Sequence, residues 1–199
     1  MFSQIDVVNM ARMRLGEDPI TSLSENSEGA SRILLTWDMT LDMELRAHVW
    51  KFATARTELA ALVTAPAFGF NFQYPLPADC VRILNVGDTY PGASIGDYIV
   101  GDDSLYKIEG QKILTNMGAP LKLIYTSRVS NTELWDASFP MVFALRLAVI
   151  LCERTSDSDT KREGILRDYR EALVSAARAN SLESAPMTIP TSTWINARL

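Results

Sequence analysis

The sequence predicts an α+β fold that is mainly α: an antiparallel helical bundle with a small antiparallel β insert and an extended C-terminal tail. Three observations lead to this prediction. Apolar residues recur at helical spacing near both ends of the 199-residue chain, short strand-like runs separated by turn residues fill its middle, and the last residues follow no period. We therefore expect a helical body from residues 1–63 and 133–182, a β insert at 64–132 and a tail at 183–199.

Two helices are predicted in the first third of the chain. Residues 4–15 follow helical spacing, and Gly16 is placed to end that helix in the left-handed conformation. After a linker that contains Pro19, a long amphipathic helix is predicted over residues 27–62, with a charged face opposite its apolar one. Its apolar positions are Ile33, Leu34, Trp37, Leu41, Leu45, Val49, Phe52 and Leu59.

A loop is predicted over residues 64–77, because three prolines and four aromatic residues there are incompatible with a helix. Short strands follow it, separated by glycine- and aspartate-rich turns, and they are expected to form an antiparallel meander. The strand-like runs are Cys80–Val86, Tyr98–Val100, Leu105–Glu109, Lys112–Thr115 and Leu121–Thr126.

Two further helices are predicted near the C-terminus. Residues 138–154 are apolar around most of the helical circumference, which indicates a central helix of the core. A polar cluster at 155–160 offers a cap for the next helix, over about 161–180. Residues 183–199 hold two prolines and Trp194 without any period, and are expected to form an extended tail.

Composition and charge narrow the class of protein. A formal net charge of -5 disfavours a protein that grips nucleic acid by neutralising phosphates. Cys80 and Cys152 are too far apart in sequence, and too isolated from other ligands, to indicate a disulfide framework or a zinc site, so two buried thiols are expected. No apolar run is long enough for a transmembrane helix. We expect a soluble protein made in the cytoplasm, without membrane contact.

The sequence carries no recognisable catalytic signature, and the chain is predicted not to be an enzyme and to need neither cofactor nor metal. His48 is the only histidine and lies within a predicted helix, where packing explains it better than acid–base chemistry. The acidic pairs Asp102–Asp103 and Asp157 with Asp159 lack the spacing of a cation-binding loop. Turn and helix-cap roles account for them.

Aromatic and apolar side chains outside the helical faces are the most unusual feature. For each of them, including Trp50 and Trp135, core packing is as good an explanation as a contact surface. As a contiguous exposed set they would mark surfaces for other proteins. The candidate interface residues are Phe68, Phe70, Phe72, Tyr74, Ile189, Trp194, Ile195 and Arg198.

Most of the chain resembles the tail tubular protein A, or head-to-tail adaptor (gatekeeper), family of tailed bacteriophages. The strings that carry the resemblance are LGEDPI at residues 15–20, LRAHVWKFA at 45–53, YPLPADCVR at 74–82, YKIEGQKILTN at 106–116, LKLIY at 121–125 and RV at 128–129. None of these strings is a catalytic motif. Their order and extent indicate a shared fold lineage.

The resemblance implies a structural virion protein that takes part in viral tail assembly and genome ejection. It implies a homo-oligomeric ring of twelve copies beneath the portal protein and above the tail tube or nozzle protein, with DNA passing through the lumen in transient, non-specific contact. An acidic chain suits a channel through which DNA slides. A closed ring needs heterologous interfaces, in which one surface of a copy meets a different surface of the next.

Two alternatives remain open at this point. Some relatives have been discussed as hydrolases of surface polysaccharide, which would require paired carboxylates that this sequence does not display. The other alternative is a tail-completion or assembly factor that is absent from the mature virion. Three segments are most relevant to the adaptor hypothesis as contact surfaces. They are the aromatic loop at residues 64–77, the tail at 183–199 with Trp194, and the polar face of the long helix predicted over 27–62.

Overall fold

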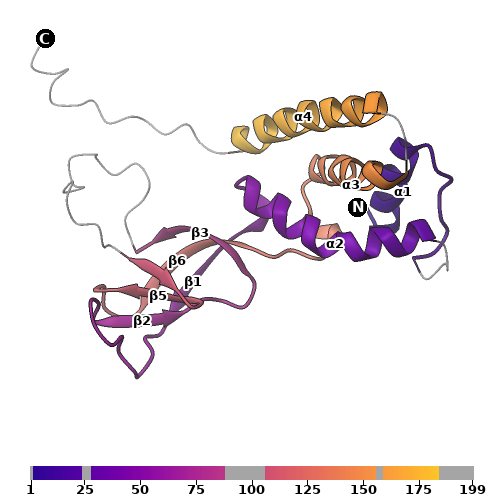
Figure 1. Ribbon diagram of the computed structural model, residues 1–199. Coiled ribbons are helices and arrows are strands. Elements are labelled where there is room, and N and C mark those ends of the chain that lie inside the picture. Colours follow the sequence, from indigo (N-terminus) through magenta and orange to yellow (C-terminus); the bar gives the residue numbers. More distant parts are fainter. Residues whose placement is uncertain (1, 24–27, 88–105, 156–158, 184–199) are drawn as a thin grey trace, which may run out of the picture. The chain divides into compact units, whose positions relative to one another are not determined.

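The computed structural model describes residues 2–23, 28–87, 106–155 and 159–183. Within these residues the chain forms four α-helices and two small antiparallel sheets, which confirms the predicted α+β class (Figure 1). They group into a helical unit, up to Thr54 and from Thr126 to Glu183, and a sheet unit from Ala55 to Tyr125. Both boundaries fall earlier in the chain than the predicted ones at 63–64 and 132–133.

Helix α1 spans Gln4–Leu15, as predicted. Ser3 caps its start in a capping box, because the Ser3 side chain accepts from the Asp6 amide while the Asp6 carboxylate accepts from the Ser3 amide. Gly16 ends the helix with φ of 73°, a left-handed conformation that glycine adopts without steric cost. The following chain is pinned by Asn9, whose side chain bonds both the N–H and the C=O of Ile20.

Helix α2 spans Glu28–Ala47, so the predicted helix over 27–62 is wrong in its second half. After Ala47 the chain passes through a short 3₁₀ turn, Lys51–Ala53, and becomes a strand. Trp50 folds back so that its indole Nε1 donates to the Glu44 carbonyl at 3.1 Å. That bond satisfies one of the carbonyls left unpaired at the helix end, and the fully buried indole ring holds the chain in its new direction.

Helices α3, Phe139–Thr155, and α4, Asp159–Leu182, are close to the predicted ranges. Helix α3 contacts α1, α2 and α4, and Figure 1 shows α2 and α4 on opposite sides of it. Its side chains are buried around most of its circumference, as its apolar sequence predicts. An aromatic cluster joins it to α2 and to the segments that flank it. Its members are Trp37, Trp50, Phe52, Trp135, Phe139 and Phe143.

The sheet unit contains two three-stranded sheets, of order β1-β6-β3 and β2-β5-β4, in place of the predicted single meander. The predicted meander lacked β1, which comes from the segment assigned to the long helix, and β2, which lies within the predicted loop. The strands are β1 Thr54–Leu59, β2 Phe72–Pro75, β3 Cys80–Val86, β4 Lys107–Glu109, β5 Lys112–Thr115 and β6 Leu121–Ser127. In the second sheet, β5 pairs antiparallel with both β2 and β4.

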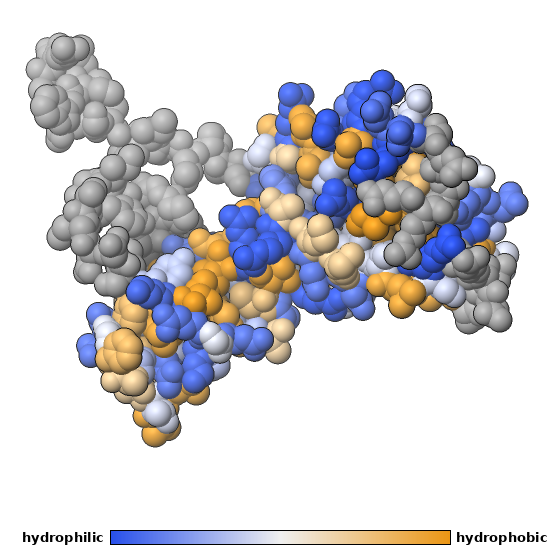
Figure 2. Space-filling view, viewed as in Figure 1, coloured by the Kyte–Doolittle hydropathy of each residue, from blue (hydrophilic) through white to orange (hydrophobic). Residues whose placement is uncertain are grey.

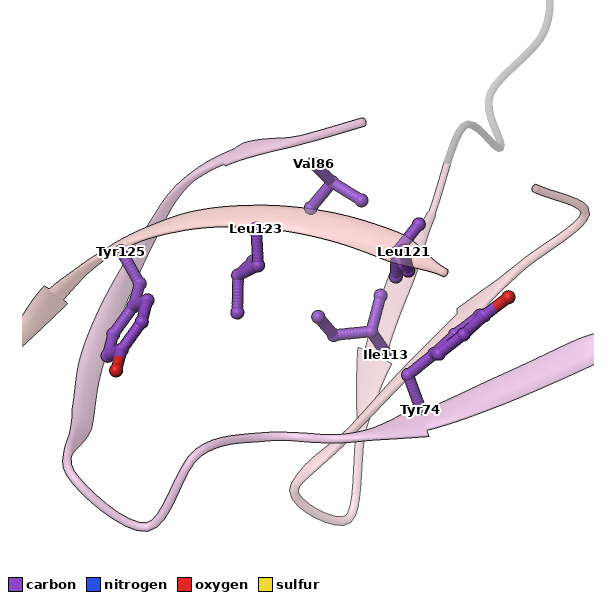
Figure 3. Close-up of a cluster of buried hydrophobic side chains, with 6 residues drawn as sticks. All are labelled: Tyr74, Val86, Ile113, Leu121, Leu123 and Tyr125. Atoms are coloured by element: carbon purple, nitrogen blue, oxygen red, sulfur yellow. The ribbon is translucent and has the colours of Figure 1, made fainter. Parts of the chain in front are cut away.

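The core of the sheet unit lies between the two sheets, where six apolar side chains point toward one another (Figure 3). Three of them alternate along β6, as expected for a strand with one buried face. Tyr74 on β2 is paired in register with Ile113 on β5. The cluster comprises Tyr74, Val86, Ile113, Leu121, Leu123 and Tyr125.

Two predicted elements, the strand at 98–100 and the tail at 183–199, lie outside the described residues, except for Glu183. The prediction of two buried thiols is correct for Cys152 and wrong for Cys80, which is half-buried on β3.

Candidate contact surfaces

The structure separates the predicted interface residues into three groups. Phe68 is 88% exposed and Phe72 is also exposed, whereas Phe70 is half-buried. Tyr74 is fully buried, so its assignment to a contact surface is wrong: its ring belongs to the core, and its hydroxyl donates to the Met117 carbonyl at 2.8 Å. The remaining four residues, Ile189, Trp194, Ile195 and Arg198, lie outside the described residues.

Trp50 and Trp135 also belong to a core, that of the helical unit. Both indole N–H groups donate to backbone carbonyls, Trp50 to Glu44 and Trp135 to Val129 at 2.8 Å. A buried indole with a satisfied N–H is a stable packing element. Neither tryptophan is therefore available as a contact residue.

The loop between β1 and β2 forms the first candidate surface, which we call the loop surface: Leu62, Val63, Phe68 and Phe72. Val63 is fully solvent-exposed and the chain from Ala60 to Ala78 carries no charged residue. In Figure 2 hydrophobic residues reach the surface at the end of this loop. Exposed apolar groups concentrated on an uncharged segment make this loop a candidate contact surface.

Hydrogen bonds hold the two ends of this loop. The Leu62 amide donates to the Gln73 carbonyl at 2.9 Å, and the Gln73 side chain donates to the Thr64 carbonyl. At the other end, the Asn71 amide donates to the side chain of Asn116 at 3.0 Å. The backbone beside Val63 and Phe72 is therefore held in place, which lowers the conformational entropy that these positions lose on docking.

The outward face of α2 forms the second candidate surface, which we call the helix stripe: Leu35, Met39 and Met43. These residues follow one another at four-residue intervals, on one side of the helix. All three are exposed, Leu35 to 83%. The sequence analysis assigned a charged face to this helix, opposite its apolar one, and did not include Leu35, Met39 and Met43 among the apolar positions.

Acidic residues border the helix stripe and are held by an arginine. The guanidinium of Arg128 bonds Oδ1 of Asp42 at 2.6 Å and Oδ1 of Asp38 at 2.8 Å. These hydrogen bonds raise the pKa of Arg128. The Asp38 side chain remains 76% exposed. Asp38 and Asp42, which belong to the predicted polar face, thus lie at the surface beside an apolar strip that the sequence did not indicate.

A buried polar cluster lies behind α2 and joins three helices. The Glu44 carboxylate accepts from the Tyr169 hydroxyl, and Nε of Arg146 lies 3.3 Å from Glu44 Oε1 without hydrogen-bond geometry. Burial raises the pKa of Glu44, against the opposing effects of the Tyr169 hydrogen bond and the Arg146 charge. Burial and the Glu44 charge raise the pKa of Tyr169. The three groups therefore link α2, α3 and α4 inside the helical unit.

His48 packs edge-on against Trp50, with ring centroids 4.8 Å apart. Burial lowers its pKa, and within the described part of the chain its Nε2 has no hydrogen-bond partner. A general base needs a partner that orients it and a path to substrate. The geometry of His48 is that of a packing residue.

One hollow lies on the outer face of the β1-β6-β3 sheet, with a volume of about 420 Å³. Its described lining includes two cations, Arg56 and Lys122, and a single carboxylate, Glu58. Glycoside hydrolysis usually requires two carboxyl groups that flank the bond. The residues of this hollow do not provide them.

The described residues show neither a metal-binding cluster nor a helix that could span a membrane. They contain no group of three or more histidine, cysteine, aspartate or glutamate side chains placed to hold a metal ion. None of the helices in that part of the chain combines the length and the apolar character needed to cross a membrane.

Comparison with known proteins does not extend these observations. The sequence matches no protein-family model, and no curated protein matches it.

Proposed function

We propose that this chain is a structural subunit of the neck of a tailed bacteriophage, a head-to-tail adaptor. In this proposal copies of the chain form a ring of twelve between the portal protein and the tail tube or nozzle, and DNA passes through the lumen in transient, non-specific contact during ejection. The chain would then be a virion component without enzymatic activity, cofactor or metal. The proposal rests on the resemblance carried by the sequence strings and on one structural observation.

That observation is the loop surface. Val63 and Phe68 project almost completely into solvent from a loop whose two ends are held by hydrogen bonds. Burial of apolar surface stabilises a complex by about 25 cal/mol per Å² of area removed from water, so these side chains favour association. Their exposure contributes nothing to the stability of the isolated fold. A subunit built to dock onto other proteins accounts for this arrangement.

The helical unit supports the same proposal. We propose that its helices act as an antiparallel bundle that forms a rigid wall of the ring. Helix α3, which is buried around most of its circumference, and the aromatic cluster around it favour a unit that keeps its shape under load, because close-packed interiors deform little. The extended tail is a further proposed contact with neighbouring proteins.

The test is assembly on the portal protein of the same phage. We expect the wild-type chain to co-purify with the portal and to appear as a ring at the neck in an electron microscopy reconstruction. The double variant Val63→Ser/Phe68→Ser should lose portal attachment while its melting temperature stays unchanged. Ile108→Ser is the matched control, because Ile108 is an exposed apolar residue of the same unit outside the loop surface, and it should assemble normally.

Three outcomes would contradict the proposal. A neck reconstruction without density for this chain would overturn the adaptor role. Its absence from purified particles by mass spectrometry, together with a requirement for it during assembly, would favour the assembly factor. Polysaccharide turnover that is lost on substitution of an aspartate or glutamate would favour the hydrolase.

A further inference from the structure

We draw no further inference here: the strongest candidate, the exposed helix stripe on α2, is bordered by Arg128 as well as by Asp38 and Asp42, so its charges select no partner, and nothing in the described part of the chain shows what covers it.

Discussion

The Tyr169 hydroxyl on α4 lies 3.0 and 3.1 Å from the two carboxylate oxygens of Glu44 on α2, to which it donates. Glu44 is only 2% exposed, so this donor replaces water at a buried carboxylate. The guanidinium of Arg146 on α3 lies over the Tyr169 ring, 5.5 Å from its centroid. The buried carboxylate of Glu44 therefore connects α2, α3 and α4. Glu44 and Tyr169, which form the hydrogen bond, are 125 positions apart in the sequence.

Removal of this hydroxyl should destabilise the helical unit. We expect Tyr169→Phe to lower the free energy of unfolding by about 1.5–3 kcal/mol, because a buried carboxylate loses its donor. Urea denaturation followed by circular dichroism measures the change. Tyr125→Phe is a matched control, since its hydroxyl bonds the exposed Asp79, and it should cost less than half as much. Equal losses in the two variants would contradict the role assigned to Glu44.

The raised pKa of Glu44 predicts a pH dependence. A carboxyl whose pKa is higher in the folded state than in the unfolded state binds its proton more tightly when folded, so protonation favours folding. The stabilisation from Glu44 is complete below its ordinary pKa and is lost as the pH rises through the raised one. The free energy of unfolding of the wild-type chain, minus that of Glu44→Gln, should therefore be larger at acidic pH than at neutral pH. If this difference in the free energy of unfolding is the same at both pH values, the pKa of Glu44 is not raised by folding.

A contrast between Tyr74 and Phe72 tests which aromatic residues of the β2 segment belong to the core. Tyr74→Ala should lower the free energy of unfolding by about 3–5 kcal/mol, as is typical of a large buried aromatic side chain. Phe72→Ser, at an exposed position two residues earlier on β2, should cost less, about 1 kcal/mol. Thermal denaturation of both variants gives the comparison. A larger loss for Phe72→Ser would place its ring in the core.

The side chain of Asn180 on α4 forms hydrogen bonds with the backbone just after the end of α2. Its Nδ2 donates to the Val49 carbonyl and its Oδ1 accepts from the Lys51 amide, both at 2.9 Å. Asn180→Ala leaves both backbone groups without this partner and should lower the free energy of unfolding by about 1–3 kcal/mol. Asn85→Ala, which removes one local bond to the Gly87 carbonyl, should have a smaller effect. Chemical denaturation of the two variants measures both losses. A larger loss for Asn85→Ala than for Asn180→Ala would contradict the role assigned to Asn180.

Arg128 should contribute little to stability despite its two ion pairs. All three side chains are at least a third exposed, so solvent screens their attraction. We expect Arg128→Gln to change the free energy of unfolding by less than about 1 kcal/mol, with the difference shrinking at high salt. A loss of several kcal/mol that salt does not reduce would show that the arginine is a core element.

Local signals in the sequence determined much of this protein. Gly16 ends α1 because glycine accepts the left-handed conformation there, and the apolar sequence of 138–154 yields the buried helix α3. Strands β3 and β5 also follow from their own residues and the turns beside them. The exposure of Phe68 agrees with the proline-rich, uncharged sequence around it. In each case the deciding interaction lies within a few residues of the position.

Tertiary contacts decided the rest. Val49, Phe52 and Leu59 continue the helical spacing of α2, and no local signal ends that helix at Ala47. The chain turns there because the Trp50 indole bonds back to Glu44 and because Asn180, about 130 positions later, supplies partners for Val49 and Lys51. The burial of Tyr74 and the exposure of Leu35, Met39 and Met43 were likewise set by partners distant in sequence. The spacing of apolar residues shows which side chains could be buried. Packing against another element decides which of them are buried.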